Sequence, residues 1–475
     1  METLSKASAL SRRQLLLGGG AFALATLAPR LSRAAPQTIL RAAPHTTQIL
    51  PGDWPATPTW AYSAQNPGPV LRVKQGERLR VMLQNDLQQP TTVHWHGLRI
   101  PHAMDGVPDV TQAPVQPGGS FVYDFMAPDA GTYWYHPHVN SSEQVGRGLH
   151  GALIVEEHNP PKVDRDLVWV LDDWRLDRDG SIRDDFQRGM DISHGGRSGN
   201  VVTVNGRMPE PLQVRKNERI RLRLINVANA RIFGLNFENH DAQVIAIDGQ
   251  PVTPHKPEFD MVLLAPGQRA DVILDCTGEA GSSHRIIDAA YQDEATVLQN
   301  IVYAEGPPVR ESAPGPAPTL APNPLTEPDL NNAEHHDITI TGGAMGAMQG
   351  AVYKGKYLPI DELVQDMRIW ALNGVAAHTT AMTPMLNFAL GKSHIITVKN
   401  ETVFPHPMHL HGHSFRVLSQ DGAPVPHTPW ADTVLLNGRG VAQIALVADN
   451  PGDWLFHCHV LAHVQGGMTS VIRVA

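Results

Sequence analysis

Histidine is the residue type whose number and spacing in this sequence point most directly to chemistry. The chain has 24 histidines among 475 residues, and many of them fall in four short motifs. These motifs are His94-Trp-His96, His136-Pro-His138, His406-Pro-Met-His409-Leu-His411 and His457-Cys458-His459-Val-Leu-Ala-His463, the last followed by Met468. Imidazole is the commonest metal ligand among side chains. A chain with this pattern is therefore predicted to bind metal.

The motifs come from a duplication. The segment 131–138 (GTYWYHPH) matches the segment 452–459 (GDWLFHCH) without a gap. Side chains alternate along a strand, so the two histidines of a His-x-His pair share one face, although a single pair is as often structural as it is a ligand. Four pairs at matching positions predict instead that eight imidazoles meet about a pseudo-twofold axis. The predicted set is His94, His96, His136 and His138 in the first copy, with His409, His411, His457 and His459 in the last.

Cys458 breaks this symmetry, because its counterpart in the first copy is Pro137, which cannot ligate. A thiolate with two imidazoles and a weak axial thioether is the ligand set of blue copper, while imidazole nitrogens also suit further copper ions. The last copy supplies the whole blue-copper set: His406, Cys458, His463 and Met468. Neighbouring residues of a strand face opposite sides, so a short covalent path is expected to join Cys458 to the histidine cluster.

Elements that could hold these side chains are short strands. Apolar and polar residues alternate in brief runs between Gly, Pro and Asn, which is typical of all-β sandwiches. One pair of strands recurs three times, in residues 71–81, 212–222 and 394–400. A chain of 475 residues also exceeds the roughly 250 to 300 that one core supports. We expect domains at 36–160, 161–305 and 336–475, with a proline-rich linker at 306–335, and a middle domain that is a spacer without copper ligands.

The N-terminus predicts export. Arg12 and Arg13 precede an apolar run from Leu15 to Ala28, and small residues follow near Ala35. This pattern is typical of a twin-arginine signal peptide spanning residues 1–35, and it predicts a periplasmic or secreted protein. A membrane anchor is the alternative, but the run is shorter than the roughly 20 residues that span a bilayer. The net charge of -9 and the absence of a dense basic stripe argue against nucleic acid as a partner.

The motifs and their order resemble those of the multicopper oxidases, in the three-domain bacterial group that includes laccases and cuprous oxidases. The resemblance implies three consecutive cupredoxin-like Greek-key β-sandwich domains and four coppers per chain. It also implies a monomeric oxidase that takes single electrons from a small reducing substrate, such as a phenol, an aromatic amine or Cu(I), and reduces O2 to water. The implied ligands are His406, Cys458, His463 and Met468 for type 1 copper, His94 and His409 for type 2, and His96, His136, His138, His411, His457 and His459 for the type 3 pair.

Reduction of O2 to water consumes protons, so a carboxylate beside the cluster is expected to deliver them. Asp105 matches the acidic position of the family pattern His-Trp-His-Gly-Leu-x-x-Pro-x-x-x-Asp-Gly, and a turn aspartate before Gly106 is the alternative. Relatives often carry a second acid just after the type 1 histidine, but Val464 stands there. We therefore expect Asp105, Cys458 and His463 to be the catalytic residues, and a second proton route is in doubt.

The nature of the substrate is left open by the sequence. The segment holding Met345 and Met348 is only thinly enriched in the methionines with which cuprous oxidases collect Cu(I), so a general laccase-like oxidase is favoured and a cuprous oxidase is the alternative. Two other functions are alternatives. A copper nitrite reductase has fewer cluster histidines than the eight found in this sequence, and a copper-free scaffold of the same fold has lost ligands that this sequence retains. Cys276 is expected to be a free thiol. Five further histidines are expected at the surface or beside the ligands: His102, His335, His336, His378 and His413.

Overall fold

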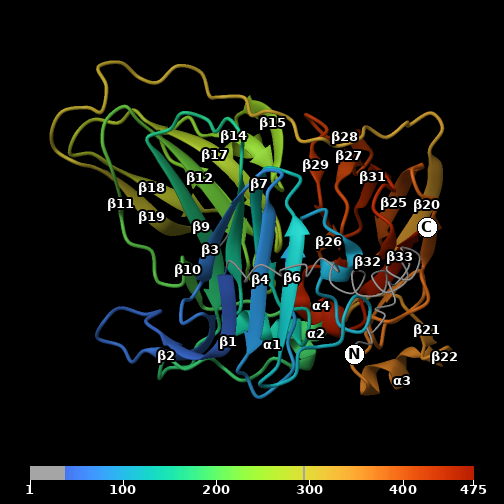
Figure 1. The fold of residues 1–475 in the computed structure, drawn as a ribbon. Helices are drawn as coiled ribbons and strands as arrows, with labels where there is room; N and C mark the ends of the chain where they lie inside the picture. The colour runs from blue at the N-terminus through green and yellow to red at the C-terminus, as the bar shows by residue number, and fades with distance from the viewer. Residues whose placement is uncertain (1–37, 292–294) are drawn as a thin grey trace, which may run out of the picture. The chain divides into compact units, whose positions relative to one another are not determined.

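A computed structural model describes residues 38–291 and 295–475, and the predicted signal peptide lies outside these residues. In this part of the chain three β-sandwiches follow one another, as the alternating apolar patterns predict (Figure 1). Each sandwich encloses its own cluster of buried apolar side chains. The prediction of an all-β fold is confirmed.

The first sandwich consists of two four-stranded sheets. One contains β2 (Thr57–Tyr62), β1 (Thr38–Thr47), β4 (Arg78–Asn85) and β6 (Ser120–Met126). The other contains β3 (Gly68–Lys74), β8 (Gly151–Glu156), β7 (Gly131–His136) and β5 (His94–His96). Two short helical segments, η1 (His102–Met104) and α1 (Ser141–Gly146), follow β5 and β7. The first two histidine motifs thus lie on or just after neighbouring strands of one sheet.

The middle sandwich is larger. Its six-stranded sheet has the order β10 (Val201–Val204), β9 (Arg165–Trp174), β12 (Glu218–Asn226), β17 (Arg269–Cys276), β14 (Gln243–Ile247) and β15 (Gln250–His255). Its five-stranded sheet has the order β11 (Leu212–Val214), β19 (Thr296–Tyr303), β18 (Ser283–Asp288), β13 (Phe233–Phe237) and β16 (Val262–Leu264). Two short segments, α2 (Gly189–Ser193) and η2 (Glu258–Asp260), lie in its connections.

The third sandwich carries the last two histidine motifs. One sheet contains β23 (Trp370–Leu372), β20 (Glu334–Gly342), β25 (Ser393–Asn400), β31 (Val441–Val447), β27 (Phe415–Gln420), β28 (Ala423–Pro424) and β29 (Trp430–Ala431). The other contains β24 (Leu386–Phe388), β33 (Thr469–Val474), β32 (Gly452–Cys458), β26 (His406–Leu410) and β30 (Thr433–Leu436). A hairpin of β21 (Gly350–Tyr353) and β22 (Lys356–Pro359) and the helices α3 (Ile360–Gln365) and α4 (Leu461–Gln465) complete it.

The predicted strand pair is present in the first two sandwiches, as β3 and β4 and as β11 and β12. Residues 394–400 of the third form the single strand β25, and its partner of the same kind is the preceding strand β24, outside the predicted segment. The two strands of each pair do not pair with each other, because they lie in opposite sheets of their sandwich. The short run between them is thus a crossover from one sheet to the other. Each pair therefore holds the two layers of a sandwich together.

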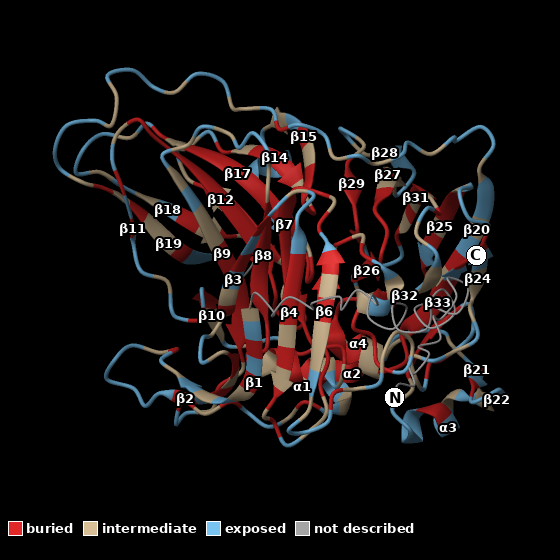
Figure 2. Ribbon diagram, in the orientation of Figure 1, coloured by how far each residue is buried: buried red, intermediate tan, exposed pale blue. Residues whose placement is uncertain are grey.

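Strand β12 is buried on both of its faces, although its sequence alternates between apolar and charged residues. Its apolar residues enter the core of the middle sandwich. Its charged side chains are buried too, since Arg223 donates to Thr132 Oγ1 of β7 at 2.9 Å and Arg221 donates to Glu157 at 2.6 Å. Figure 2 shows β7, β12 and β17 as almost wholly buried. The polar face of β12 is thus an interface with the first sandwich.

The proline-rich segment contains no helix or strand from residue 304 to residue 333. It is anchored at several points. Asn323 donates to the carbonyl of Ala130 at 2.8 Å and accepts from the Ala130 N–H at 2.8 Å, and Arg310 donates to Asp164 at 2.6 Å. In the described part of the chain, no helix has the length and apolar character needed to cross a membrane.

Candidate metal centre

Strand pairing places the histidine motifs in the same way in both copies. In the first sandwich His94 on β5 lies opposite His136 on β7. In the third, His409 on β26 lies opposite His457 on β32. The duplication seen in the sequence is therefore preserved in the register of the strands. The first and third sandwiches each present four cluster histidines on or just after strands of one sheet.

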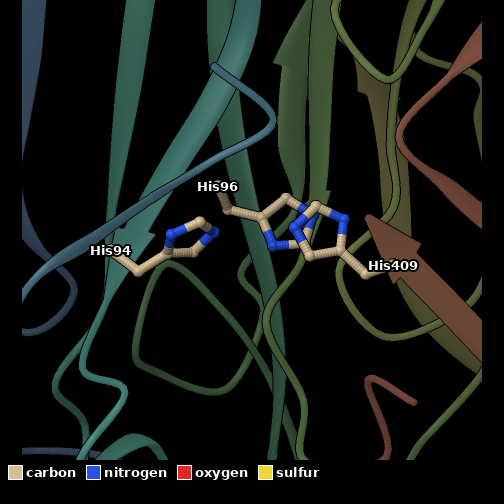
Figure 3. Close-up of side chains that lie close together, drawn as sticks. All are labelled: His94, His96 and His409. Carbon is tan, nitrogen blue, oxygen red and sulfur yellow. The ribbon is translucent and has the colours of Figure 1, made fainter. Parts of the chain in front are cut away.

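The eight rings from the two sandwiches meet in one buried cluster. His94 stacks on His411 with ring centroids 3.8 Å apart. His96 stacks on His409 at the same distance (Figure 3). Each stack joins the first sandwich to the third. Ligand atoms lie within 4.8 Å of one another in four groups of these rings: His94, His96 and His409; His94, His138 and His411; His96, His136 and His459; and His409, His411 and His457. The predicted cluster is thus assembled from two parts of the chain, residues 94–138 and 409–459, which are 271 positions apart at their nearest.

Hydrogen bonds fix several rings through one nitrogen, and some of these rings leave the other nitrogen without a partner. The Nδ1 atoms of His136 and His457 bond to the carbonyls of Pro137 and Cys458 at 3.1 and 2.8 Å. Seven ring nitrogens of the cluster are buried without a hydrogen-bond partner in the described chain: Nε2 of His94, His136, His138 and His409, Nδ1 of His96, and both nitrogens of His459. Unpaired buried polar atoms are costly, so this set fits a metal cluster.

Burial keeps these rings in the form that binds metal. Burial lowers the pKa of His457 to about 3 and holds the pKa of His96 and of His138 well below the ordinary value. Metal ligation requires the neutral imidazole. The rings of His96, His138 and His457 therefore offer neutral nitrogen ligands over the whole physiological pH range, a donor set that suits copper.

A second site lies beside the cluster, within the third sandwich. The Sγ atom of Cys458 lies 3.6 Å from Nδ1 of His406 and 3.5 Å from Nδ1 of His463, and these two nitrogens are 3.1 Å apart. Met468 is fully buried and belongs, like Cys458, to the apolar core of the third sandwich. Its carbonyl accepts from the Cys458 N–H at 3.2 Å. Two imidazoles and one thiol thus converge as the blue-copper set requires.

Each histidine of the second site is oriented by its other nitrogen. Nε2 of His406 lies 2.8 Å from the Thr402 hydroxyl, and Nε2 of His463 donates to the carbonyl of His194 at 2.6 Å. Such outer partners set the tautomer and orientation of ligand histidines. The His194 contact comes from the middle sandwich, just after α2, and a backbone carbonyl leaves no signal in the sequence by which it could have been found.

Asp105 links two histidines across the cluster. One carboxylate oxygen accepts from His94 Nδ1 at 2.9 Å, and the other accepts from His411 Nδ1 at 2.9 Å. The side chain is buried. The structure therefore brings Asp105 to the cluster as the sequence predicts, and gives it contacts that a simple turn residue lacks.

The middle sandwich contributes Arg269 to a buried ion pair with Asp432 of the third sandwich, which the sequence did not reveal. Arg269 on β17 donates to Asp432 at 2.8 and 2.6 Å, and Asp432 accepts from His96 Nε2 at 3.1 Å. Asp248 accepts from the backbone N–H of Arg269 at 2.9 Å and from that of Asp432 at 3.2 Å. Burial opposes ionisation of Asp432, but the Arg269 charge holds its pKa below the ordinary range. The middle domain therefore supports the cluster and is more than a spacer.

Loss of the Arg269 guanidinium should destabilise the fold. Arg269→Met leaves the carboxylates of Asp248 and Asp432 buried without their counter-charge, which typically costs about 3–5 kcal/mol. Arg285→Met is the matched control, because the Arg285 side chain is 54% exposed in its pair with Glu238 and such pairs contribute about 0–1 kcal/mol. Thermal unfolding should show a much larger fall in Tm for the first variant. Equal shifts would contradict this role for Arg269.

The remaining predicted residues lie outside the two sites. Cys276 is a free thiol, as expected, and burial raises its pKa to about 12. His413 is buried beside the cluster, with Nδ1 3.3 Å from the carbonyl of His411. His102 Nε2 donates to the carbonyl of Asp453 at 2.9 Å. Val464, where relatives often carry a second acid, is partly exposed at α4.

Comparison with known proteins agrees with this geometry. Residues 45–160, 165–300 and 353–475 each match a family profile described as multicopper oxidase. The chain is 31% identical over 445 residues to multicopper oxidase MmcO of Mycobacterium tuberculosis, covering 88% of this chain and 83% of that protein. It is 27% identical to Laccase-1 of Cryptococcus neoformans, covering 86% of this chain and 76% of that protein.

A solved structure matches as well. The crystal structure of a multi-copper oxidase from Pseudomonas thermotolerans superposes with a TM-score of 0.80 at 35% identity, covering 93% of this chain and 100% of that one. The sandwiches are thus cupredoxin-like, and the enzyme class is a copper-dependent oxidoreductase that uses oxygen. The chain belongs to the multicopper oxidase family.

Proposed function

We propose that this protein is an exported laccase-like oxidase that binds four coppers and couples oxidation of phenols, aromatic amines or low-valent metal ions to reduction of O2. The observation that carries the proposal is the convergence of eight buried histidines from two sandwiches, beside a separate site of one cysteine and two histidines. A copper-free scaffold would not need these unpaired buried nitrogens.

The proposed ligand sets follow the grouping of the rings. Type 1 copper would be held by His406, Cys458, His463 and Met468. Type 2 copper would be held by His94 and His409, and the type 3 pair by His96, His136, His138, His411, His457 and His459. The group of His96, His136 and His459 supports one half of the type 3 pair, and the contacts among His138, His411 and His457 support the other.

Copper supplies one-electron redox chemistry in the second site and dioxygen chemistry in the cluster. The chain joins the two, because Cys458 lies between His457 and His459 on one strand end. Electrons then need to cross only the Cys458 side chain, one peptide unit and the side chain of His457 or His459. Asp105, bonded to rings of both sandwiches, is placed to pass protons to reduced oxygen.

The choice of reductant separates two related activities. Met348 and Met385 pack against apolar clusters, whereas Met345 and Met367 are 63% and 38% exposed. Met348 and Met385 thus have packing roles, which supports a general laccase-like oxidase. Steady-state kcat/KM with a phenol and with Cu(I), measured on one preparation, tests this. A much higher value with Cu(I) would favour the cuprous oxidase instead.

Met468 is expected to tune the type 1 site without being essential. A blue-copper site is held by its thiolate and two imidazoles, so Met468→Leu should remain blue. Its reduction potential should rise, because loss of the thioether donor destabilises Cu(II) relative to Cu(I). Met408→Leu is the control, since Met408 lies opposite Cys458 on β26. A redox titration in which Met468→Leu has an unchanged or lower potential would count against this role.

We further propose the domain limits 36–160, 161–305 and 336–475, with 306–335 as linker, and a monomer exported to the periplasm by the twin-arginine route. The absence of helices and strands from residue 304 to residue 333 supports the linker. The adjacent Arg12 and Arg13 support the twin-arginine route. Fractionation of cells in which Arg12 and Arg13 are replaced by lysine tests the route. The protein should then accumulate inside the cytoplasm.

A further inference from the structure

Two histidines and a carboxylate gather at the beginning of the third sandwich, and none of them belongs to either proposed copper site. They are Glu334 and His336 on β20 and His394 on β25. The two strands run parallel, and Glu334 is the register partner of His394. Glu334 and His336 are two residues apart and therefore share a face of β20. The strand pairing thus brings all three side chains to one place.

The distances between their donor atoms suit a single metal ion. Nε2 of His336 lies 3.0 Å from Nδ1 of His394, and Oε2 of Glu334 lies 3.7 Å from the same nitrogen. Two donors that each lie about 2.1 Å from one ion are separated by roughly 3.0–3.4 Å at ordinary coordination angles, and by about 4.2 Å at most. Both measured distances fall within that limit.

The rings are supported from one side by an aromatic side chain, and only His336 and Glu334 reach solvent. The Phe388 ring stacks on His394 at 3.9 Å and lies 4.8 Å from the ring of His336. His394 is buried, His336 is half-buried, and the Glu334 side chain is 56% exposed. On the outer edge of β20, strand β23 pairs only with residues 340–342, so within the described chain no strand covers the segment 334–336.

We propose that Glu334, His336 and His394 form a separate binding site for a divalent transition-metal ion, such as Zn2+. Two imidazoles and one carboxylate are ligands of this class of ion, and water would complete the coordination. The site is distinct from the proposed type 1 site, because Asn400, at the end of β25 that contacts the loop before His406, lies about 20 Å further along the strand. A bound ion would fasten the strand that follows the linker to its neighbour, and so stabilise the fold.

Zinc binding to the copper-loaded protein tests the proposal. The protein is incubated with Zn2+, freed of excess metal, and assayed for zinc per chain, with zinc X-ray absorption to count imidazole ligands. The wild type should retain one zinc ion with two imidazoles. His336→Gln removes one ligand and should weaken zinc binding by more than the roughly 10–100-fold typical of losing an outer-shell partner.

His335→Gln is the matched control, because His335 is the exposed neighbour that points to the opposite face of β20. This variant should bind zinc as the wild type does. Glu334→Gln provides a second test at an exposed position and should weaken binding about tenfold or more. The blue absorption of each variant verifies that the fold is intact. A wild type without zinc, or zinc binding in His336→Gln equal to that of the wild type, would show that the two rings merely share a hydrogen bond.

Discussion

The Cys458→Ser variant is expected to lose the blue absorption and all substrate oxidation, while copper stays bound in the eight-histidine cluster. A hydroxyl cannot replace a soft thiolate beside His406 and His463, so the charge-transfer band disappears and substrate no longer delivers electrons. The cluster ligands belong to other side chains and are untouched. Visible spectroscopy and copper analysis of the same sample measure both effects.

Cys276→Ser is the natural control, since Cys276 is the other cysteine of the chain and is buried in the core of the middle sandwich. It should remain blue and active, with only a change in stability. An intense blue band that persists in Cys458→Ser would remove the basis of the type 1 assignment.

The Asp105→Asn variant is expected to lower turnover by about 10²–10⁴-fold, the range typical of losing a positioned proton-transfer group. The substitution is nearly isosteric, so copper and the blue band should remain. The amide has one acceptor oxygen, so it can accept a hydrogen bond from His94 or from His411 but not from both. The amide also cannot take up and release a proton as the carboxylate does. Stopped-flow measurements should show rapid anaerobic reduction by substrate and slow reoxidation by O2.

Asp109→Asn is the matched control for this experiment, because Asp109 lies on the same loop and is exposed. Its reoxidation rate should equal that of the wild type. Val464 stands at the position of the usual second acid. Asp432 also accepts from a cluster histidine, but Arg269 holds its pKa below the ordinary range, so we expect neither residue to rescue Asp105→Asn. If Asp105→Asn itself reoxidises at the wild-type rate, protons reach the cluster by another route.

Much of the metal centre could be predicted from the sequence because its ligands come in short motifs. The two residues of a His-x-His pair, or Cys458 and His463, lie close along the chain, so their spacing reflects the geometry of one strand or one loop. The duplication then indicates which motifs meet. For the same reason the all-β fold could be predicted from alternation within runs of only a few residues.

The buried charged residues that hold the metal-centre histidines in place could not be predicted in this way. Arg269, Asp248 and Asp432 come from separate strands and loops, and no local pattern pairs a guanidinium with a carboxylate 163 residues away. The signal that could have revealed them is a lone charged residue inside an apolar run, as at Ala431-Asp432-Thr433-Val434. Buried charges are rare unless they are paired.

The most direct test of the account is a crystal structure of the copper-loaded protein with an anomalous difference map measured at the copper absorption edge. We predict four copper peaks per chain. One should lie among His406, Cys458 and His463, and three should lie among the eight histidines that the first and third sandwiches contribute. A map without a peak beside Cys458, or with fewer than three peaks among the eight histidines, would contradict the four-copper assignment.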